Sequence, residues 1–258
     1  MEALLAKDYP TAKDALVAAL ASPHRRPGHA ERDRYRHPVE VMEFFGLRKD
    51  MTVVEVGAGA GWWTELLAVV LHRDGKLVLP SYAEDDPDPT RAYFGLRDRL
   101  LLESAPVLYG RVERFIQPSG ETSFGPPQSA DMVLVVRMLH NWHRFGTFDA
   151  DAKAAFEVLR PGGILAVVQH RAPEGGDPDE WAEKGYLPEA YVIDALGRAG
   201  FELVAKSEVN ANPKDTKDHP EGVWTLPPTL ALGDVDREKY LAIGESDRMT
   251  LKFRRPEG

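Results

Sequence analysis

Three glycines at alternate positions follow an early apolar run, and they are the clearest sign of chemistry in the sequence. Residues 53–61 read VVEVGAGAG, with Glu55 two residues before Gly57, and Gly59 and Gly61 completing the series. Glycine has no Cβ, so it admits positive φ and lets a ligand approach the backbone closely. Three of them after a buried strand weaken the fold unless the space is used, which favours a ligand-binding turn over a plain tight connection.

The spacing of these glycines argues against a dinucleotide site. The dinucleotide fingerprint is G-x-G-x-x-G, whereas here Trp62 occupies the position of the third glycine. A bulky ring would crowd the place where a pyrophosphate binds at a helix N-terminus. The carboxylate of Glu55 suits a cationic ligand better than a diphosphate. The face of Trp62 could contact a cation or simply shield the helix end, whereas Trp63 continues an apolar helix face and is predicted to be core.

Histidines follow two later apolar runs, in places where parallel strands would end. His140 and His143 come after one run, and His170 comes after the next. An unperturbed histidine has a pKa of about 6.5, so we predict that His140 accepts a proton from the substrate and that His143 is the second candidate. Two histidines at this spacing could also bind a metal, but no carboxylate lies nearby at a ligand spacing, and we predict no metal site. The remaining candidate contacts around the substrate are Asn141, Trp142 and His170.

A basic segment precedes the glycine turn. Residues 24–38 read HRRPGHAERDRYRHP and contain five arginines, two acidic residues and three of the eight histidines. Such a segment could be a lid that folds over the site or a solvated surface strip. We favour the lid, with Tyr35 and His37 as contacts to the substrate.

Alternating strands and helices are predicted to position these groups. Continuous apolar strands separated by helices indicate a parallel sheet covered on both faces, and in such sheets ligands gather at the carboxyl ends of the strands. We expect strands at 51–56, 76–80, 111–116, 131–139, 164–169, 201–209 and 247–253, and helices at 62–71, 89–102, 148–159 and 188–199. We assign 1–37 to an N-terminal helical extension and 38–258 to one α/β domain. Long connections at 117–130, 170–187 and 210–233 are candidate binding loops.

The composition limits the function classes. The 258 residues carry a formal net charge of −9, which argues against nucleic-acid binding, because phosphate contacts need a basic surface. There is no cysteine, so thiolate chemistry is excluded. No apolar run is long enough to span a membrane, and the first 20 residues mix charges into an amphipathic helix pattern that does not match a signal peptide. We therefore expect a cytoplasmic protein with a small-molecule substrate; the oligomeric state stays open.

The sequence E-x-G-x-G-x-G after a first strand resembles the first motif of class I S-adenosylmethionine-dependent methyltransferases. The resemblance implies a doubly wound, mostly parallel sheet of seven strands with the last one antiparallel, a place that DRMTLKF at 247–253 could take. It implies S-adenosyl-L-methionine as the cofactor, with the glycine turn beneath it and the acidic residue near its ammonium group. The expected cofactor contacts are Glu55, Gly57, Ala58, Gly59, Gly61, Trp62, Ser81 and Arg137.

One departure from the family concerns the end of the second strand. The family usually has an acidic residue there for the ribose hydroxyls, whereas this chain has Ser81 in LVLPSYAEDD. Either Ser81 makes a weaker contact, or Glu84, Asp85 or Asp86 reaches back. We favour a solvated acidic loop for these three residues. The segment QPSGETSFGPP lies where the adenine contact would come from and contains no diagnostic residue.

The segments DRYRHPVE, RMLHNWH and GESDRMTLKF resemble a bacterial branch of these enzymes whose acceptors are not established. The branch implies methyl transfer to a small molecule without naming the acceptor atom. Its members often carry signal peptides, a feature this sequence does not show. The alternative function is a non-catalytic protein that binds S-adenosylmethionine or S-adenosylhomocysteine. A nicotinamide oxidoreductase is disfavoured by the glycine spacing.

Overall fold

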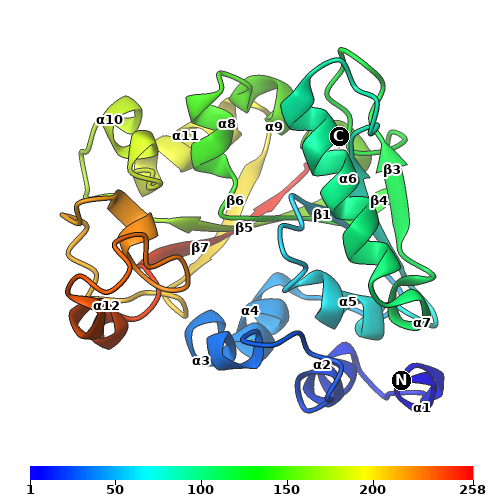
Figure 1. The fold of residues 1–258 in the computed structure, drawn as a ribbon. Coiled ribbons are helices and arrows are strands. Elements are labelled where there is room, and N and C mark those ends of the chain that lie inside the picture. The colour runs from blue at the N-terminus through cyan, green and yellow to red at the C-terminus, as the bar shows by residue number, and fades with distance from the viewer. Residues whose placement is uncertain (258) are drawn as a thin grey trace.

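The centre of the protein is a seven-stranded sheet, seen in a computed structural model that describes residues 1–257 (Figure 1). The strands are β1 (Thr52–Val56), β2 (Lys76–Ser81), β3 (Glu113–Ile116), β4 (Ala130–Val136), β5 (Leu159–His170), β6 (Glu202–Ser207) and β7 (Arg248–Arg254). Their order is β3-β2-β1-β4-β5-β7-β6; β7 runs antiparallel to both of its neighbours, and the remaining pairs are parallel. The predicted doubly wound, mostly parallel sheet is therefore confirmed.

Helices cover both faces of the sheet. Their bounds are α4 (Pro38–Phe45), α5 (Thr64–Val70), α6 (Pro89–Glu103), α7 (Pro106–Tyr109), α8 (Leu139–Arg144), α9 (Phe148–Val158), α10 (Pro178–Glu183), α11 (Glu189–Arg198) and α12 (Arg237–Ile243). The 3₁₀ helix η2 spans Gly222–Thr225. Figure 1 shows α4 and α5 on one side of the sheet and α8, α9 and α11 on the other. Two apolar clusters, one on each face, form the core, which explains the nearly continuous apolar character of β1 and β4.

The main departures from the predicted elements lie beside the site. The strand expected at 131–139 ends at Val136, Arg137 has a φ of 59°, and α8 begins at Leu139. The apolar run continues past the strand because Leu139 lies on the buried face of the new helix. The helix expected at 62–71 begins only at Thr64, which leaves both tryptophans in the preceding turn.

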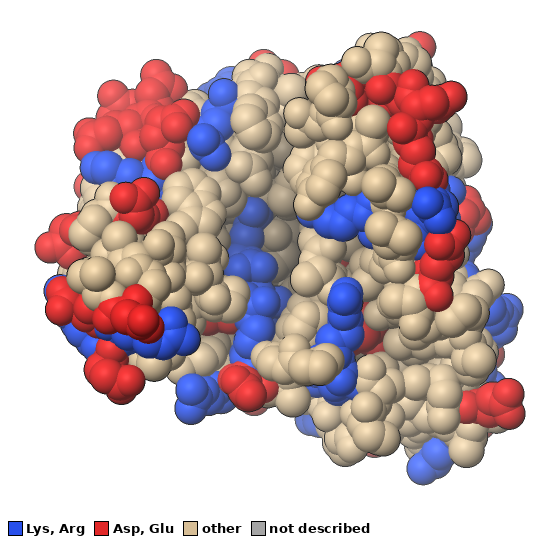
Figure 2. Space-filling model, in the orientation of Figure 1, with Lys and Arg blue, Asp and Glu red and all other residues tan. Residues whose placement is uncertain are grey.

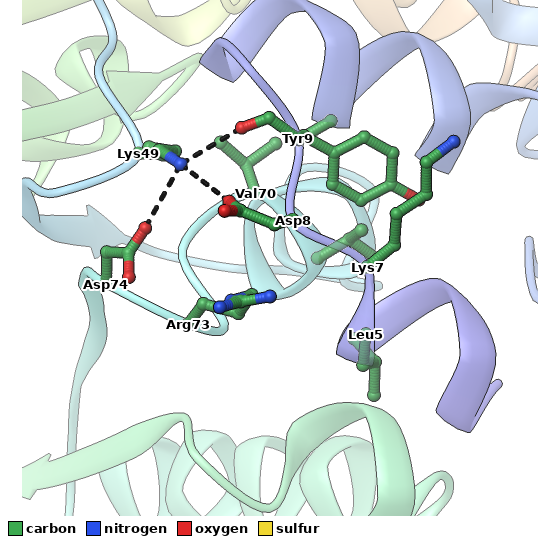
Figure 3. A pocket seen from close by; sticks show the side chains of 10 residues that line it. Leu5, Lys7, Asp8, Tyr9, Lys49, Val70, Arg73 and Asp74 are labelled. Atoms are coloured by element: carbon green, nitrogen blue, oxygen red, sulfur yellow. Dashed lines mark hydrogen bonds and ion pairs between the residues drawn. The ribbon is translucent and has the colours of Figure 1, made fainter.

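The first 37 residues are helical and pack on the domain. They comprise α1 (Glu2–Ala6), α2 (Ala12–Leu20), the 3₁₀ helix η1 (Ala30–Arg32) and α3 (Asp33–Arg36). A pocket between this extension and α5 is closed by Lys49, whose ammonium group donates to Asp8 Oδ1 at 2.9 Å and to the Tyr9 carbonyl at 3.0 Å (Figure 3). The same ammonium group lies 3.3 Å from Asp74. These partly exposed pairs add to the apolar packing of Leu5, Ala15 and Leu16, which holds the extension in place, and we assign the pocket no ligand.

The carboxyl ends of the parallel strands meet at one edge of the sheet. The start of the antiparallel strand β7 lies at the same edge, because Arg248 is the register partner of His170 at the end of β5. Within residues 1–257, no helix combines the length and the apolar character needed to cross a lipid bilayer.

Candidate functional site

The glycine turn has the backbone geometry that its sequence predicts. The φ angles are 70° at Gly57, 62° at Gly59 and 82° at Gly61, all in the region that favours glycine. A Cβ added at Gly57 would lie 2.8 Å from the sulfur of Met138, and one at Gly61 would lie 2.6 Å from Leu101. A Cβ at Gly59 would meet nothing closer than 3.9 Å. Packing therefore explains the first and third glycines, whereas Gly59 faces open space that a ligand could fill.

Glu55 is buried beneath this turn. Its carboxylate accepts a hydrogen bond from the Thr64 hydroxyl at 2.8 Å, at the start of α5. Burial raises the pKa of Glu55 to about 8, and the negative charge of Asp98 raises it further against the effect of the Thr64 bond. Glu55 therefore holds its proton more tightly than an exposed glutamate does.

A carboxylate of α6 lies against the end of β2. Ser81 is fully buried and donates to Asp98 Oδ2 at 2.9 Å, while Arg114 Nε donates to Ser81 Oγ at 3.2 Å. We did not predict a role for Asp98, which lies 17 residues further along the chain. The sequence carried one sign of such a role: Asp98 is a charged residue at the helical spacing of Gly95 and Leu101, on the buried face of α6.

The acidic side chains of the loop after β2 form ion pairs and hydrogen bonds at the protein surface. Glu84 is exposed and pairs with Arg99 at 2.9 Å and with Arg114 at 3.2 Å. Asp86 accepts a hydrogen bond from the backbone of Asp88. These contacts agree with a solvated loop more than with one reaching back to a ribose.

Trp62 and Trp63 are both buried and meet edge to face, with ring centroids 4.7 Å apart. Trp63 belongs to the core, as predicted. The indole N–H of Trp62 donates to the His29 carbonyl at 2.9 Å, and the guanidinium groups of Arg36 and Arg25 lie over its ring at 4.5 and 5.4 Å. Two arginines of the basic segment therefore stack on the Trp62 ring.

Glu65 anchors this basic segment to α5. The Glu65 side chain is fully buried, pairs with Arg25, lies 3.0 Å from His29 Nδ1 and accepts from the Arg26 backbone at 3.1 Å. Burial alone would raise the pKa of Glu65, but the bonds from His29, Arg25 and Arg26 outweigh it and lower that pKa. His24 also contacts the Glu65 carbonyl at 3.0 Å. The segment is therefore docked beside the glycine turn.

His140 and His170 face each other at the carboxyl edge, with ring centroids 5.8 Å apart. His140 Nδ1 lies 3.2 Å from the side-chain nitrogen of Gln169, and His170 Nδ1 lies 2.5 Å from Ser246 Oγ. Burial lowers the pKa of His140 to about 4 and takes the pKa of His170 well below its usual value, with nearby Arg137 adding to both effects. Both rings are neutral at physiological pH.

An aromatic residue that we did not predict lies beside His140. The Trp224 ring, in η2 within the long connection 210–233, has its centroid 6.1 Å from that of His140. Trp224 does not belong to a periodic apolar pattern, so the sequence carries no direct sign of its role. The one indication was its position in a connection that we named as a candidate binding loop.

His143 points elsewhere. Its Nδ1 lies 2.7 Å from the Tyr191 hydroxyl, and its Nε2 lies 2.7 Å from Asp179, so both ring nitrogens are engaged with α10 and α11. Trp142 is buried against Phe124 and Phe148 in the core, whereas Asn141 is half-buried. His140 is brought to the carboxyl edge, and Asn141 Nδ2 lies 4.0 Å from the sulfur of Met138, the residue that packs against Gly57.

The other predicted substrate contacts lie at the end of the basic segment. The Tyr35 carbonyl accepts a hydrogen bond from Arg248 Nη2 at 2.6 Å, and a Cβ at Gly244 would lie 2.6 Å from the Tyr35 ring. His37 has a φ of 43° between α3 and α4, and burial lowers its pKa. Tyr35 therefore joins the basic segment to the start of β7.

Four arginines surround one glutamate at this edge. Glu245 accepts from Arg32 at 2.6 Å, from Arg36 at 3.4 Å and from Arg248 at 3.1 Å. Burial would raise the pKa of Glu245, but the charges of Arg36, Arg248, Arg137 and Arg32 lower it to about 2. These five residues are called the arginine cluster below. Figure 2 shows Lys and Arg atoms inside the hollow at the middle of this face.

The described residues 1–257 contain no group of three or more His, Asp or Glu side chains arranged to hold a metal ion. The groups present are suited to hydrogen bonding, proton transfer and the binding of charged ligands.

No protein-family model matches the chain, and no curated protein sequence matches it. Solved structures do. An S-adenosylmethionine-dependent methyltransferase from Aquifex aeolicus is 19% identical over 87% of this chain and 93% of that chain, with a TM-score of 0.53. The cyclase SpnF is 17% identical over 98% of each chain, with a TM-score of 0.59. An S-adenosylmethionine-dependent methyltransferase from Methanosarcina mazei is 13% identical over 84% of this chain and 98% of that chain, with a TM-score of 0.51. The chain therefore has the fold of class I S-adenosylmethionine-dependent methyltransferases.

Proposed function

We propose that the protein transfers a methyl group from S-adenosyl-L-methionine to a small-molecule acceptor. The observation that carries this proposal is the open space at Gly59, at the carboxyl end of β1, in a fold shared with methyltransferases. Ligands of open α/β sheets bind at this edge, and a turn with left-handed glycines lets them approach the backbone.

The residues around the turn suit a cationic cofactor. Gly57, Ala58, Gly59 and Gly61 would pass beneath it, and Glu55 would lose its proton when an ammonium group comes near. The ribose hydroxyls would lie at the end of β2, near the buried pair of Ser81 and Asp98. In this proposal Trp62 does not contact the cofactor. It packs beside the turn, and Arg25 and Arg36 stack on its ring.

The chain's task in methyl transfer is to position two reactants and to exclude water. When bound, the cofactor supplies a methyl group on a sulfonium, whose sulfur keeps the electron pair of the breaking bond while the acceptor's lone pair forms the new one. A hydroxyl, thiol or ammonium acceptor must also lose a proton. His140 and His170 are the groups at the edge that could bind the acceptor atom through a hydrogen bond. The lowered pKa of both rings makes them weak bases, so the base role predicted for His140 is not the one its surroundings favour.

Calorimetric titration with S-adenosylmethionine, S-adenosylhomocysteine and NAD tests the cofactor. We expect the first two to bind and NAD not to bind; binding of NAD alone would replace the proposal with an oxidoreductase. A screen of small acceptors, read as formation of S-adenosylhomocysteine, then tests turnover.

The variant His140→Ala links turnover to the site. It should lower kcat by about 10²–10⁴-fold and leave cofactor affinity nearly unchanged, because loss of a positioned proton-transfer or hydrogen-bonding group acts on the reaction step. His143→Ala is the matched control, since His143 bonds only to Asp179 and Tyr191. Equal losses in both variants would remove His140 from the site.

A second candidate function is binding of S-adenosylmethionine or S-adenosylhomocysteine without turnover. It is favoured by Ser81, which stands where the family has an acidic residue. The cyclase SpnF has the same fold, so the fold alone does not require methyl transfer. Tight cofactor binding with no product from a broad acceptor screen would support this candidate.

A further inference from the structure

The arginine cluster holds more positive charge than its own residues neutralise. Glu245 is the single carboxylate among Arg32, Arg36, Arg137 and Arg248, so the cluster has an excess of three positive charges. Arginine stays charged at every physiological pH. This excess is notable in a chain whose formal net charge is −9.

Several guanidinium nitrogens in the cluster are buried without a partner. They are Nη2 of Arg32, Nη2 of Arg36, Nε of Arg137 and Nε of Arg248. Arg137 is the extreme case, because its guanidinium forms no hydrogen bond or ion pair within residues 1–257. Burial lowers the pKa of Arg137 to about 10; the charge of Glu245 opposes this shift, and the charges of Arg32 and Arg248 add to it. Buried donors are normally satisfied, so these atoms point to a missing acceptor.

Neighbouring carboxylates do not supply that acceptor. Asp247 is held by Arg171 at 3.0 Å and by Lys217 at 3.0 Å. Asp215 accepts from His219 at 2.8 Å and from the Tyr186 hydroxyl. Each of these acidic groups is already paired with its own donors.

The proposed cofactor offers a single carboxylate, which cannot offset three excess positive charges. S-adenosylmethionine carries a sulfonium, an ammonium and one carboxylate at neutral pH, so it is a cation overall. Its binding beside the cluster would add positive charge to a site that already has too much. Like charges that are brought together in a poorly solvated site disfavour binding, unless an anion accompanies them.

The cluster lies between the two halves of the candidate site. Arg36 stacks on Trp62 beside the glycine turn, and Arg248 is the register partner of His170. Arg137 follows β4 directly, and its charge reaches both His140 and His170. A group held here would lie between the cofactor turn and the two histidines.

We propose that the arginine cluster binds the anionic group of the acceptor, so that the acceptor is a small molecule with a carboxylate or a phosphate. This inference rests on the proposed function and deepens it. Guanidinium groups bind both oxyanions through paired N–H donors, which fits several arginines converging on one place. Under this proposal Arg137 binds the acceptor, whereas the sequence predicted it to be a cofactor contact.

The test measures anion binding to the protein with and without saturating S-adenosylhomocysteine. Inorganic phosphate and acetate are titrated against sodium chloride at equal ionic strength, with the melting temperature and calorimetric affinity as readouts. We expect at least one of the two oxyanions to stabilise the protein where chloride does not, because binding to the folded state alone raises its stability.

Arg137→Gln should weaken the oxyanion affinity by about tenfold or more, as expected for loss of a charge-assisted hydrogen bond, and leave S-adenosylhomocysteine binding unchanged. Arg254→Gln is the matched control, because Arg254 lies at the opposite end of β7 and pairs with Glu202 at the surface. Glu245→Gln should strengthen oxyanion binding, since it removes the competing carboxylate.

Three results would overturn the inference. One is the absence of any oxyanion effect beyond that of chloride, in either state of the protein. Another is an equal effect of Arg137→Gln and Arg254→Gln. The third is an Arg137→Gln variant that loses cofactor affinity but keeps oxyanion affinity, which would return Arg137 to the cofactor and leave the proposed function standing. Failure of the unaltered protein to bind S-adenosylhomocysteine would instead overturn the proposed function.

Discussion

Gln169 and His140 form a hydrogen bond that decides which nitrogen of the histidine carries its proton. The amide nitrogen of Gln169 lies 3.2 Å from His140 Nδ1 and also 3.2 Å from the Gly185 carbonyl. A carbonyl only accepts, so the amide must present its NH₂ group on this side. His140 Nδ1 is therefore an acceptor, and in the neutral ring Nε2 bears the hydrogen.

This tautomer predicts that His140 acts as a hydrogen-bond donor near neutral pH. With a pKa of about 4, the ring should stay neutral and protonated at Nε2 from pH 5 to pH 8. Two-dimensional ¹⁵N NMR of the histidine rings reports both the tautomer and the titration. A ring that titrates near pH 6.5, or a proton on Nδ1, would show that the Gln169 bond does not govern it.

The raised pKa of Glu55 predicts that cofactor binding depends on pH. The free carboxyl has a pKa of about 8, whereas a bound ammonium group would favour its ionised form, so a proton must leave on binding below pH 8. Affinity should rise by up to about tenfold per pH unit as the pH increases toward 8, and then level off. Calorimetry in buffers with different ionisation enthalpies would count the released proton.

Glu55→Gln is the control for this dependence, because it keeps the shape of the side chain and removes the titration. It should bind S-adenosylmethionine about tenfold more weakly at pH 8.5 and differ little from the parent at pH 6. Its folding should gain relative stability as pH rises from about 4.5 to 8, because over this range the parent's unfolded state ionises Glu55 while its folded state keeps the proton. Identical pH profiles for the two proteins would make Glu55 purely structural.

Gly59→Val is predicted to abolish cofactor binding in a protein that still folds. The side chain would fill the open space above the turn, where nothing in the protein lies closer than 3.9 Å to an added Cβ. Gly233→Val is the matched control, because Gly233 has a φ of 61° and open space around it, and so carries a similar backbone penalty. Circular dichroism would establish folding, and titration would establish affinity. Retained affinity in Gly59→Val would remove the turn from the cofactor site.

Residues 24–37 are predicted to act as a lid that is anchored at Glu65. Hydrogen exchange of this segment should slow when S-adenosylmethionine binds, because the segment closes over the site. Glu65→Gln should speed exchange there by about tenfold or more, since it breaks the pairing with Arg25 and His29. Glu43→Gln breaks only an exposed pair with Lys13 and should change nothing. Exchange that is the same with and without cofactor would favour a fixed surface strip.

The sheet and the glycine turn were predictable because their signals are local. The buried run of β1, the left-handed glycines and the alternation of elements can be read from neighbouring residues. The arginine cluster was not predictable, because Arg32 and Glu245 are 213 residues apart and have no common pattern. Asp98 was missed for the same reason, as its meaning depends on the approach of α6 to Ser81. Side chains that pair across the fold become visible only when the elements are placed.

The buried pairing of Glu65 also bears on where this protein can be divided. A shortened chain that begins at Pro38 would keep every strand, yet it would remove Arg25 and His29 from Glu65 and uncover apolar surface of α5 that packs with Ala15 and Leu16. Newly exposed apolar surface and the loss of these pairings both cost stability. We therefore expect the first 37 residues to be needed for the stability of the domain.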